Sequence, residues 1–246
     1  MNKHLPHSVY LIHGWAANGR IFDGLRPLLP ETWRVHTPDL PGHGNAPSDG
    51  TFDIMAAADA LAAEMPDNSD VVGWSLGGLV ALHLSIRYPH KVRRLCLTSS
   101  FAKFLAASDY PQGQSRTALD KMIALFEQDY PKYMRQFLQL QLLNTLDGEE
   151  IIASVLPDMV KNGAPATLKA ALDALSLADA RPFLRQIRQP VLLVYGGKDS
   201  ITPPRMGEYL CRQLPNSRLL LIEKAAHAPF LSHADEFSGL LKRFFG

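Results

Sequence analysis

The stretch that decides the fold is Val71-Val72-Gly73-Trp74-Ser75-Leu76-Gly77-Gly78. An apolar run leads into a Gly-x-Ser-x-Gly pattern, and a helical run at 76–88 follows it. This order predicts a buried strand, a tight turn and a helix, the context in which such a serine acts as a nucleophile. Gly73 and Gly77 are expected where a side chain would collide with the backbone. In isolation the pattern also fits a glycine-rich turn with an incidental serine.

Short apolar runs recur on both sides of this stretch, with helical segments between them. Strands of this kind, alternating with helices, indicate a mostly parallel central sheet with helices on both faces. Strands are expected at 8–12, 33–38, 70–73, 92–98, 191–195 and 218–222. The sequence therefore predicts an α/β fold.

The strand pattern stops between residues 101 and 185, where helical periodicity takes over. Helices are expected at 118–126, 130–143, 151–159 and 167–175, with breaks at Pro131, Gly148, Pro157, Gly163 and Pro165. A helical block inserted into a parallel sheet indicates a lid over the site. We therefore expect one domain in which 1–100 and 186–246 form the core and 101–185 form the lid.

The bulk properties are those of an ordinary globular protein. The 246 residues carry a net charge of +1, which provides no electrostatic footprint for nucleic acid or an anionic membrane. No apolar run is long enough for a signal peptide or a membrane span. Cys96 and Cys211 show neither metal-ligand nor disulfide spacing, and Cys96 is expected to be buried and inert. We expect a soluble, cytoplasmic monomer.

A serine hydroxyl is a poor nucleophile at neutral pH and needs an adjacent base. In a fold of this type the chain order is serine, acid, histidine, with the histidine after the last strand. Only His227 and His233 follow the last expected strand. His227 comes after a short turn at the carboxyl end of the sheet, where sites in open α/β sheets form. His227 is therefore the predicted general base, and His233 is interpreted as a residue at the start of the final helix.

The acid that orients the histidine is predicted to be Asp199, which follows the strand at 191–195 through a glycine turn. Some related folds place the acid after the preceding strand, but the segment 97–101 contains no carboxylate. Asp39 and Asp70 come before the nucleophile and break the expected order.

The oxyanion of an acyl-transfer reaction needs two converging N–H donors. Leu76, directly after the serine, is expected to supply one from its backbone, and Trp15, in the loop after the first strand, the other. His13 and His43 lie in glycine-containing turns, and we interpret both as residues that shape their loops.

Together these motifs resemble the α/β-hydrolase family along the whole chain. The stretches 73–81 and 224–230 are similar to the pimeloyl-[acyl-carrier protein] methyl ester esterases of biotin synthesis, and 135–141 resembles the part of their lid that meets the substrate chain. The resemblance implies that the substrate contacts Trp15, Ser75, Leu76, Phe137, Gln141 and His227. Phe137 fits equally well as a core aromatic residue of the lid.

The resemblance also implies an activity, which is hydrolysis of the methyl ester of pimeloyl-[acyl-carrier protein] through an acyl-enzyme on Ser75. The partner would be the acyl-carrier protein, and no metal or organic cofactor would be needed. One feature departs from the family, whose lid presents a basic cluster to the acidic carrier. Residues 110–180 contain six basic and nine acidic side chains, a net charge of −3. The docking surface is therefore expected to be weaker or displaced, with Lys132, Arg135, Arg181, Arg185 and Arg188 as candidate contacts.

Two other functions fit the same motifs. A broad-specificity short-chain carboxylesterase or a carbon–carbon bond hydrolase would keep the serine, acid and histidine and differ in the lid, which sets the substrate. A ligand receptor on the same scaffold would bind a small molecule without multiple turnover.

Overall fold

The structure, a computed structural model, describes residues 7–143, 145–161 and 166–246. Six strands form one sheet in the order β2-β1-β3-β4-β5-β6, and every neighbouring pair is parallel. The strands are β1 (His7–Ile12), β2 (Trp33–His36), β3 (Ser69–Trp74), β4 (Val92–Thr98), β5 (Val191–Gly196) and β6 (Ser217–Ile222). The predicted parallel sheet is confirmed, and all its carboxyl ends meet at one edge.

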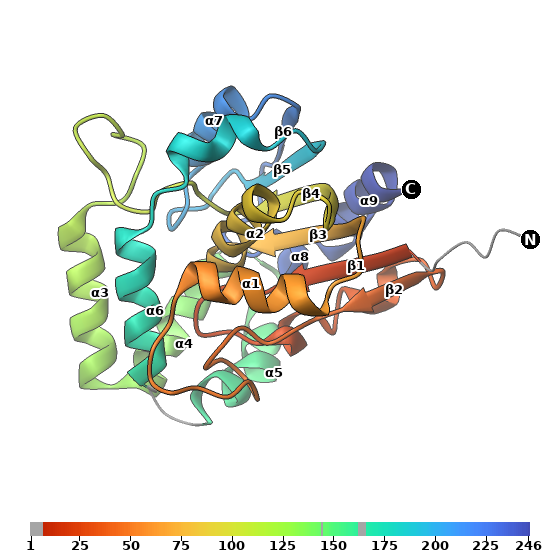
Figure 1. Cartoon of the computed structure of the whole chain (residues 1–246). Coiled ribbons are helices and arrows are strands. Elements are labelled where there is room, and N and C mark those ends of the chain that lie inside the picture. Colours follow the sequence, from red (N-terminus) through yellow and green to blue (C-terminus); the bar gives the residue numbers. More distant parts are fainter. Residues whose placement is uncertain (1–6, 144, 162–165) are drawn as a thin grey trace, which may run out of the picture.

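Helices cover both faces of the sheet, as predicted. Figure 1 shows α1 and α2 in front of the strands and α9 behind them. The helices outside the segment between β4 and β5 are α1 (Ile54–Glu64), α2 (Leu76–Arg87), α7 (Pro204–Gln213), α8 (Pro229–Ser232) and α9 (Ala234–Phe245). There are also short 3₁₀ helices, η1 (Gly19–Phe22), η2 (Arg26–Leu28) and η3 (Arg181–Gln186). The interior strands β3 and β5 are buried along their whole length because both of their faces are covered.

The outer strand β6 differs from the interior strands. Its residues alternate between half-buried and exposed from Ser217 to Leu220, Leu221 is also exposed, and only Ile222 is buried. An edge strand has a neighbour on one side only, so fewer of its side chains are enclosed.

A helical segment lies between β4 and β5 in the chain, beyond the carboxyl ends of the strands (Figure 1). It contains α3 (Arg116–Gln128), α4 (Tyr130–Gln141), α5 (Gly148–Val160) and α6 (Ala166–Leu177). Side-chain caps fix two of the starts, since Ser115 accepts a hydrogen bond from the Ala118 N–H and Asp129 accepts one from the Lys132 N–H. All four predicted helices are present.

The break predicted at Pro157 is wrong, because this residue lies inside α5. Pro157 is three residues from the end of the helix, so its missing N–H removes a hydrogen bond only in the last turn. Ile152 and Met159, on either side of it, are buried and keep the helix packed against the rest of the protein. Gly163 and Pro165 lie outside the described residues.

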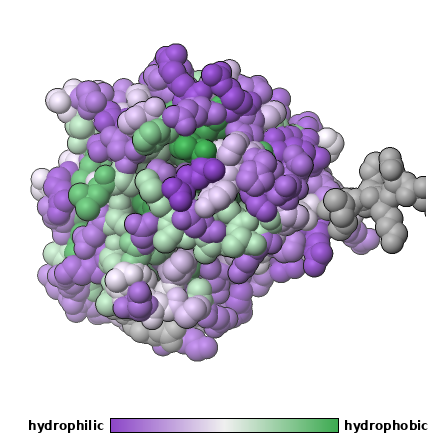
Figure 2. Space-filling view, in the orientation of Figure 1, coloured by the Kyte–Doolittle hydropathy of each residue, from purple (hydrophilic) through white to green (hydrophobic). Residues whose placement is uncertain are grey.

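The surface in the view of Figure 2 is mostly hydrophilic, with patches of hydrophobic residues between the polar ones. None of the helices in the described ranges is both long and apolar enough to cross a membrane.

Candidate active site

Ser75 occupies a sharp turn between β3 and α2. Its backbone has φ 53° and ψ −118°, a region that residues with a side chain rarely adopt and that costs on the order of 1–3 kcal/mol. Four hydrogen bonds hold this conformation. The Ser75 N–H donates to Thr98 O at 3.1 Å, and Ser75 O accepts from the N–H groups of Gly78 and Leu79 and from Ser100 Oγ. A strained turn fixed in this way lifts the hydroxyl clear of the sheet.

Both glycines of the pattern sit where a Cβ has no room. A Cβ on Gly77 would lie 2.4 Å from the carbonyl oxygens of Ile12 and His13, and one on Gly73 would lie 2.6 Å from the Cα of Gly78. These are backbone atoms, which cannot rotate away as the end of a side chain can. The collision expected from the sequence is confirmed.

His227 and Asp199 form a buried pair. His227 Nδ1 lies 2.9 Å from Asp199 Oδ2, and only 2% of His227 and 4% of Asp199 are exposed. Burial raises the pKa of Asp199, but the charge of His227 and hydrogen bonds from His227 and Thr202 outweigh burial, so the pKa lies below its ordinary value. The carboxylate is therefore ionised at neutral pH and can stabilise a protonated imidazole.

Thr202 contributes to this pair, and the sequence analysis missed it. Its hydroxyl donates to Asp199 Oδ2 at 2.7 Å and lies 3.1 Å from His227 Nδ1, while the N–H groups of Ile201 and Thr202 both donate to Asp199 Oδ1 at 2.9 Å. The spacing Asp-x-x-Thr after a strand was the feature of the sequence from which Thr202 could have been predicted. The hydroxyl of a threonine three residues after an aspartate commonly reaches back in a turn, so the spacing by itself does not distinguish a site from a turn.

Trp74 brings the serine and the histidine to the same place. It directly precedes Ser75, its indole Nε1–H donates to His227 O at 2.9 Å, and its ring centroid lies 5.5 Å from that of His227. Neither the Ser75 hydroxyl nor His227 Nε2 hydrogen-bonds to any residue that the structure describes. Ser75, His227 and Asp199 therefore lie in turns at the carboxyl edge of the sheet, linked by the Trp74–His227 and His227–Asp199 hydrogen bonds.

The sequence predicts that the backbone N–H groups of Trp15 and Leu76 meet the oxyanion. Within the described ranges no backbone or side-chain group accepts a hydrogen bond from the backbone N–H of Trp15 or of Leu76. Leu76 is the first residue of α2, where N–H groups have no partner within the helix. The loop that carries Trp15 passes close to the serine, since a Cβ on Gly14 would lie 3.2 Å from the Ser75 Cβ. Two unused donors beside a candidate nucleophile can stabilise an oxyanion.

His13 and His43 behave as loop residues. His13 Nδ1 lies 2.8 Å from Gly14 O, and its Nε2 accepts from the Leu40 N–H at 2.9 Å. Burial, with the neighbouring His43, lowers the pKa of His13 to about 3, so the ring is neutral at pH 7. His43 Nδ1 similarly lies 3.0 Å from Pro41 O, and burial lowers its pKa. His233 is the cap residue before α9, as expected.

Phe137 and Gln141, the two residues of the helical segment that were predicted to contact the substrate, lie near the Trp15 loop and the His227 turn respectively. The Phe137 ring lies 5.8 Å from the Trp15 ring, centroid to centroid, with Phe126 also 5.1 Å from Trp15. The backbone oxygen of Gln141 accepts a hydrogen bond from the N–H of Ala228, the residue after His227. Only 1% of Gln141 is exposed, and its Oε1 has no hydrogen-bond partner among the described residues. A buried amide oxygen without a partner, on a residue whose backbone is bonded to the neighbour of His227, can accept a hydrogen bond from a bound molecule.

The carboxylates set aside in the sequence analysis have structural roles. Asp70 is fully buried at the amino end of β3, where it pairs with Arg93 and Arg94 of β4. Asp39 accepts hydrogen bonds from the N–H groups of Gly19 and Asn45. Neither lies with Ser75 and His227. Cys96 is buried, as expected, and burial raises the pKa of its thiol.

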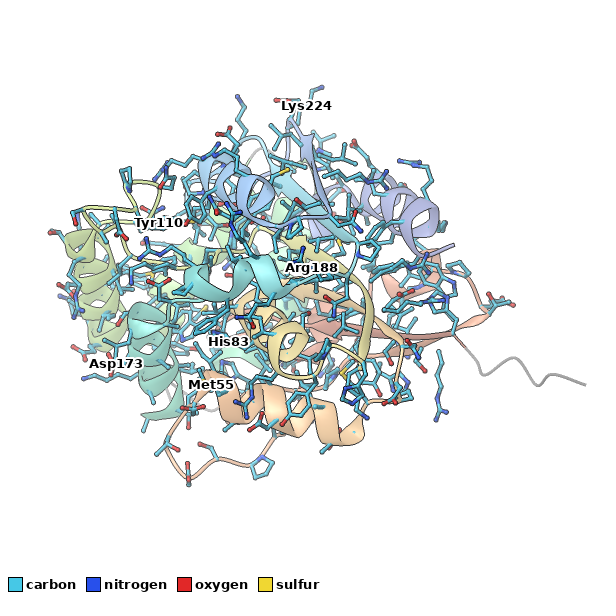
Figure 3. The ribbon with its side chains drawn as sticks, turned by 45° about the horizontal axis from the view of Figure 1, so that its top comes forward. Met55, His83, Tyr110, Asp173, Arg188 and Lys224 are labelled. Atoms are coloured by element: carbon cyan, nitrogen blue, oxygen red, sulfur yellow. The ribbon has the colours of Figure 1, made fainter. Side chains whose placement is uncertain are left out.

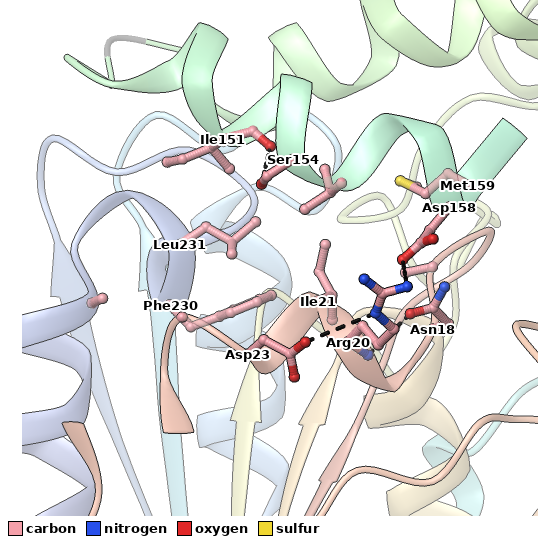
Figure 4. A pocket seen from close by; sticks show the side chains of 14 residues that line it. Asn18, Arg20, Ile21, Asp23, Ile151, Ser154, Asp158, Met159, Phe230 and Leu231 are labelled. Carbon is pink, nitrogen blue, oxygen red and sulfur yellow. Dashed lines mark hydrogen bonds and ion pairs between the residues drawn. The ribbon is translucent and has the colours of Figure 1, made fainter. Parts of the chain in front are cut away.

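Two cavities flank this region. The first, of about 470 Å³, lies between α3, α4 and the turn after Asp199, and we call it the α3–α4 groove. Its lining is mostly apolar and includes Phe104, Met122, Phe126, Phe137, Ser200 and Ile201. The second, of about 310 Å³, lies between η1, α5 and α8, where Figure 4 shows Arg20 reaching Asp158 of α5 at 2.6 Å. The groove opens beside the Asp199 turn, and an apolar chain fits its lining.

Comparison with known proteins agrees with this geometry. The family model described as alpha/beta hydrolase fold matches residues 7–234. The chain is 60% identical over 245 residues to a pimeloyl-[acyl-carrier protein] methyl ester esterase of Neisseria meningitidis serogroup C / serotype 2a, covering 98% of this chain and 96% of the relative. It is 36% identical over 229 residues to the protein of that name from Chromobacterium violaceum, covering 93% and 90%.

A solved structure shares the fold closely. The esterase EaEST from Exiguobacterium antarcticum superimposes with a TM-score of 0.89 at 25% identity, covering 97% of this chain and 91% of that one. The chain belongs to the α/β-hydrolase fold family, and within it to the group of the pimeloyl-[acyl-carrier protein] methyl ester esterases.

Proposed function

We propose that this chain is a serine carboxylesterase of biotin synthesis that hydrolyses the methyl ester of pimeloyl-[acyl-carrier protein], releasing methanol and free pimeloyl-[acyl-carrier protein]. The observation that carries the proposal is the 60% identity, over nearly the full length of both chains, to a relative of that name. The buried Asp199–His227 pair next to the strained Ser75 supports a hydrolytic reaction.

In the proposed mechanism the Ser75 Oγ attacks the ester carbonyl while His227 Nε2 takes its proton. Asp199 holds the Nδ1–H of the histidine and stabilises the imidazolium that forms. The negative charge on the carbonyl oxygen is met by the backbone N–H groups of Trp15 and Leu76. His227 then gives its proton to the departing methoxide, so that methanol leaves and an acyl-enzyme remains on Ser75.

The second half of the reaction uses the same groups. His227 takes a proton from a water molecule, whose oxygen attacks the acyl carbonyl, and then returns the proton to Ser75 as the carboxylate product leaves. No step needs a metal or an organic cofactor.

We assign the acyl chain to the α3–α4 groove and propose that the helical segment at 101–185 acts as a lid on the core formed by 1–100 and 186–246. The groove is apolar, as a chain of methylene groups requires, and Phe137 joins its wall to Trp15. Gln141, whose backbone oxygen is bonded to Ala228, supplies a buried acceptor in its side-chain Oε1. We place the enzyme in the cytoplasm as a monomer, where the acyl-carrier protein that bears the substrate is its partner.

The test is product analysis on the carrier-linked substrate. The purified protein is incubated with pimeloyl-[acyl-carrier protein] methyl ester, and mass spectrometry follows the loss of one methyl group, with acyl chains two carbons shorter and longer as controls. We expect demethylation that is fastest at the pimeloyl length. Turnover of p-nitrophenyl butyrate without demethylation would favour a broad short-chain esterase, and turnover of neither would favour a receptor.

A further inference from the structure

We propose that the acidic carrier protein docks on a rim of cations at the carboxyl ends of β5 and β6, and not on α4 and α5. This inference rests on the proposed function. We call the surface the β5–β6 rim and define it by Lys198, Arg205 and Lys224; Lys121, in the lining of the α3–α4 groove, is a further cation.

The three residues of the rim come from adjoining turns. Lys198 follows β5, and its backbone N–H donates to Ala225 O at 2.9 Å, so the turns after β5 and β6 touch. Lys224 directly precedes Ala225, and Figure 3 shows it at the top of the molecule, extending away from the protein. Arg205 lies in the first turn of α7, six residues after Asp199. All three side chains are exposed.

The rim is continuous with the groove proposed for the acyl chain. Gln114 Nε2 donates to Ser200 O at 2.7 Å and to Ile201 O at 2.8 Å, and all three residues line the groove. Arg205 Nε donates to Gln112 O at 2.9 Å on the same loop. A carrier protein seated on the rim would therefore hold its acyl group at the mouth of the groove. Lys121 of α3 also lines the groove.

The positive charge of the rim is not neutralised within the described part of the chain. No carboxylate there lies within 4.0 Å of the charged group of Lys121, Lys198, Arg205 or Lys224. The nearby acids are largely engaged elsewhere, since Asp120 pairs with Arg116 and Glu208 pairs with Arg212, although Glu223 adjoins Lys224. Free surface cations attract an acidic partner and increase its rate of association.

The face formed by α4 and α5 has the opposite character. Arg135 of α4 is held by Glu149, and Arg20 of η1 is held by Asp158 of α5, so these two cations are neutralised. Lys132 of α4 is exposed, with no carboxylate of the described residues within 4.0 Å, and is the free cation of this face that the candidates included. Asp147 and Glu150 remain exposed beside the two ion pairs. An acidic protein approaching this face meets net negative charge, which disfavours docking there.

A second basic cluster lies at the amino ends of the strands, the edge of the sheet opposite Ser75. It consists of Arg185, Arg188 and Arg212 around a cavity of about 460 Å³. Arg188 comes three residues before β5, so the cluster borders the amino ends of the strands, and the Ser75 turn lies at their carboxyl ends. Strands of six residues at about 3.3 Å each separate the two edges by roughly 20 Å. Arg181, the other candidate of this region, pairs with Asp109 and Asp179.

The test compares charge reversals at the two edges. The double variant Arg205→Glu/Lys224→Glu alters the rim, and the single reversal Arg188→Glu is the control at the opposite edge. Each is assayed with pimeloyl-[acyl-carrier protein] methyl ester and with p-nitrophenyl butyrate, which has no carrier. For the double variant we expect KM on the carrier substrate to rise about tenfold with kcat little changed, and hydrolysis of p-nitrophenyl butyrate to stay within about twofold of the parent. We expect Arg188→Glu to match the parent on both.

The outcomes separate the two proposals. An unchanged KM for the rim variant, a larger rise for Arg188→Glu, or equal losses on both substrates would overturn the docking surface while leaving the proposed function intact. A parent protein that hydrolyses p-nitrophenyl butyrate and leaves the carrier-linked ester untouched would overturn both. If the double variant does not fold, the neutral pair Arg205→Gln/Lys224→Gln replaces it, with a KM rise of about threefold expected.

Discussion

His227 Nδ1 lies 2.9 Å from Asp199 Oδ2, although the two residues are 28 positions apart in the chain. The contact joins the turn after β5 to the turn after β6, two strands that pair in parallel along their whole length. Because parallel neighbours end at the same edge, an acid after one strand and a histidine after the next meet without any special loop. The sheet register sets this contact, and the chemistry proposed for Ser75 depends on it.

Replacing Ser75 tests the nucleophile and the strain of its turn together. Ser75→Ala and Ser75→Gly are both expected to lower kcat on p-nitrophenyl butyrate by about ten-thousandfold or more, because no oxygen remains to attack. Thermal unfolding is expected to place Ser75→Gly above Ser75→Ala, because glycine adopts φ 53° without the penalty that a Cβ brings. Residual turnover above a few per cent in Ser75→Ala would contradict the assignment.

Substitution of a glycine in the Ser75 turn is expected to destabilise the protein, because a Cβ has no room there. Gly77→Ala places a Cβ 2.4 Å from the carbonyl oxygens of Ile12 and His13 and is expected to lower the free energy of unfolding by about 3 kcal/mol. Gly24→Ala is the matched control, since a Cβ there meets no atom within 4 Å. Its effect in urea denaturation is expected to stay within about 1 kcal/mol. Similar midpoints for the two variants would show that the turn has room to relax.

Because His13 is buried, the free energy of unfolding is expected to fall in mild acid. Its pKa is lowered to about 3 in the folded state from 6.5, so between these values the unfolded chain binds the extra proton and stability rises with pH. From this residue alone the free energy of unfolding is expected to be about 2 kcal/mol lower at pH 5 than at pH 7.

Urea denaturation of the parent and of His13→Asn at several pH values measures this dependence. The variant loses loop hydrogen bonds, so its absolute stability falls and only the slope against pH is informative. We expect a shallower slope than that of the parent. Parallel slopes would mean that His13 is not the residue that titrates.

Thr202 is predicted to position the acid. Thr202→Val keeps the shape of the side chain and removes the hydroxyl that donates to Asp199 Oδ2. We expect kcat to fall by roughly tenfold with KM unchanged, because the carboxylate and the imidazole lose alignment while the substrate groove is untouched. Thr202→Ser restores the donor and is expected to recover most of the activity. A valine variant with parental kcat would assign the hydroxyl a packing role only.

The backbone organisation was readable from the sequence because it depends on local patterns. The run 71–78 contains a strand, a turn and the start of a helix within eight residues, and all three are present. The wrong prediction of a helix break at Pro157 also came from a local pattern. Proline disfavours a helix locally, and the packing of Ile152 and Met159 outweighs that preference.

The Gly-x-Ser-x-Gly pattern singled out Ser75, and chain order singled out Asp199 and His227, because parallel strands bring their carboxyl ends to one edge and few polar residues follow them. Thr202 and the ion pairs of the surface were not accessible in this way. A hydroxyl three residues after an aspartate, or an arginine on a helix, has many possible partners until the helices are packed. The sequence by itself determined the sheet, the turn and the net charge of the helical segment. Only the tertiary structure decided which cations are neutralised and which face the groove, because an ion pair is set by side chains within 4 Å in space and not by their order in the chain.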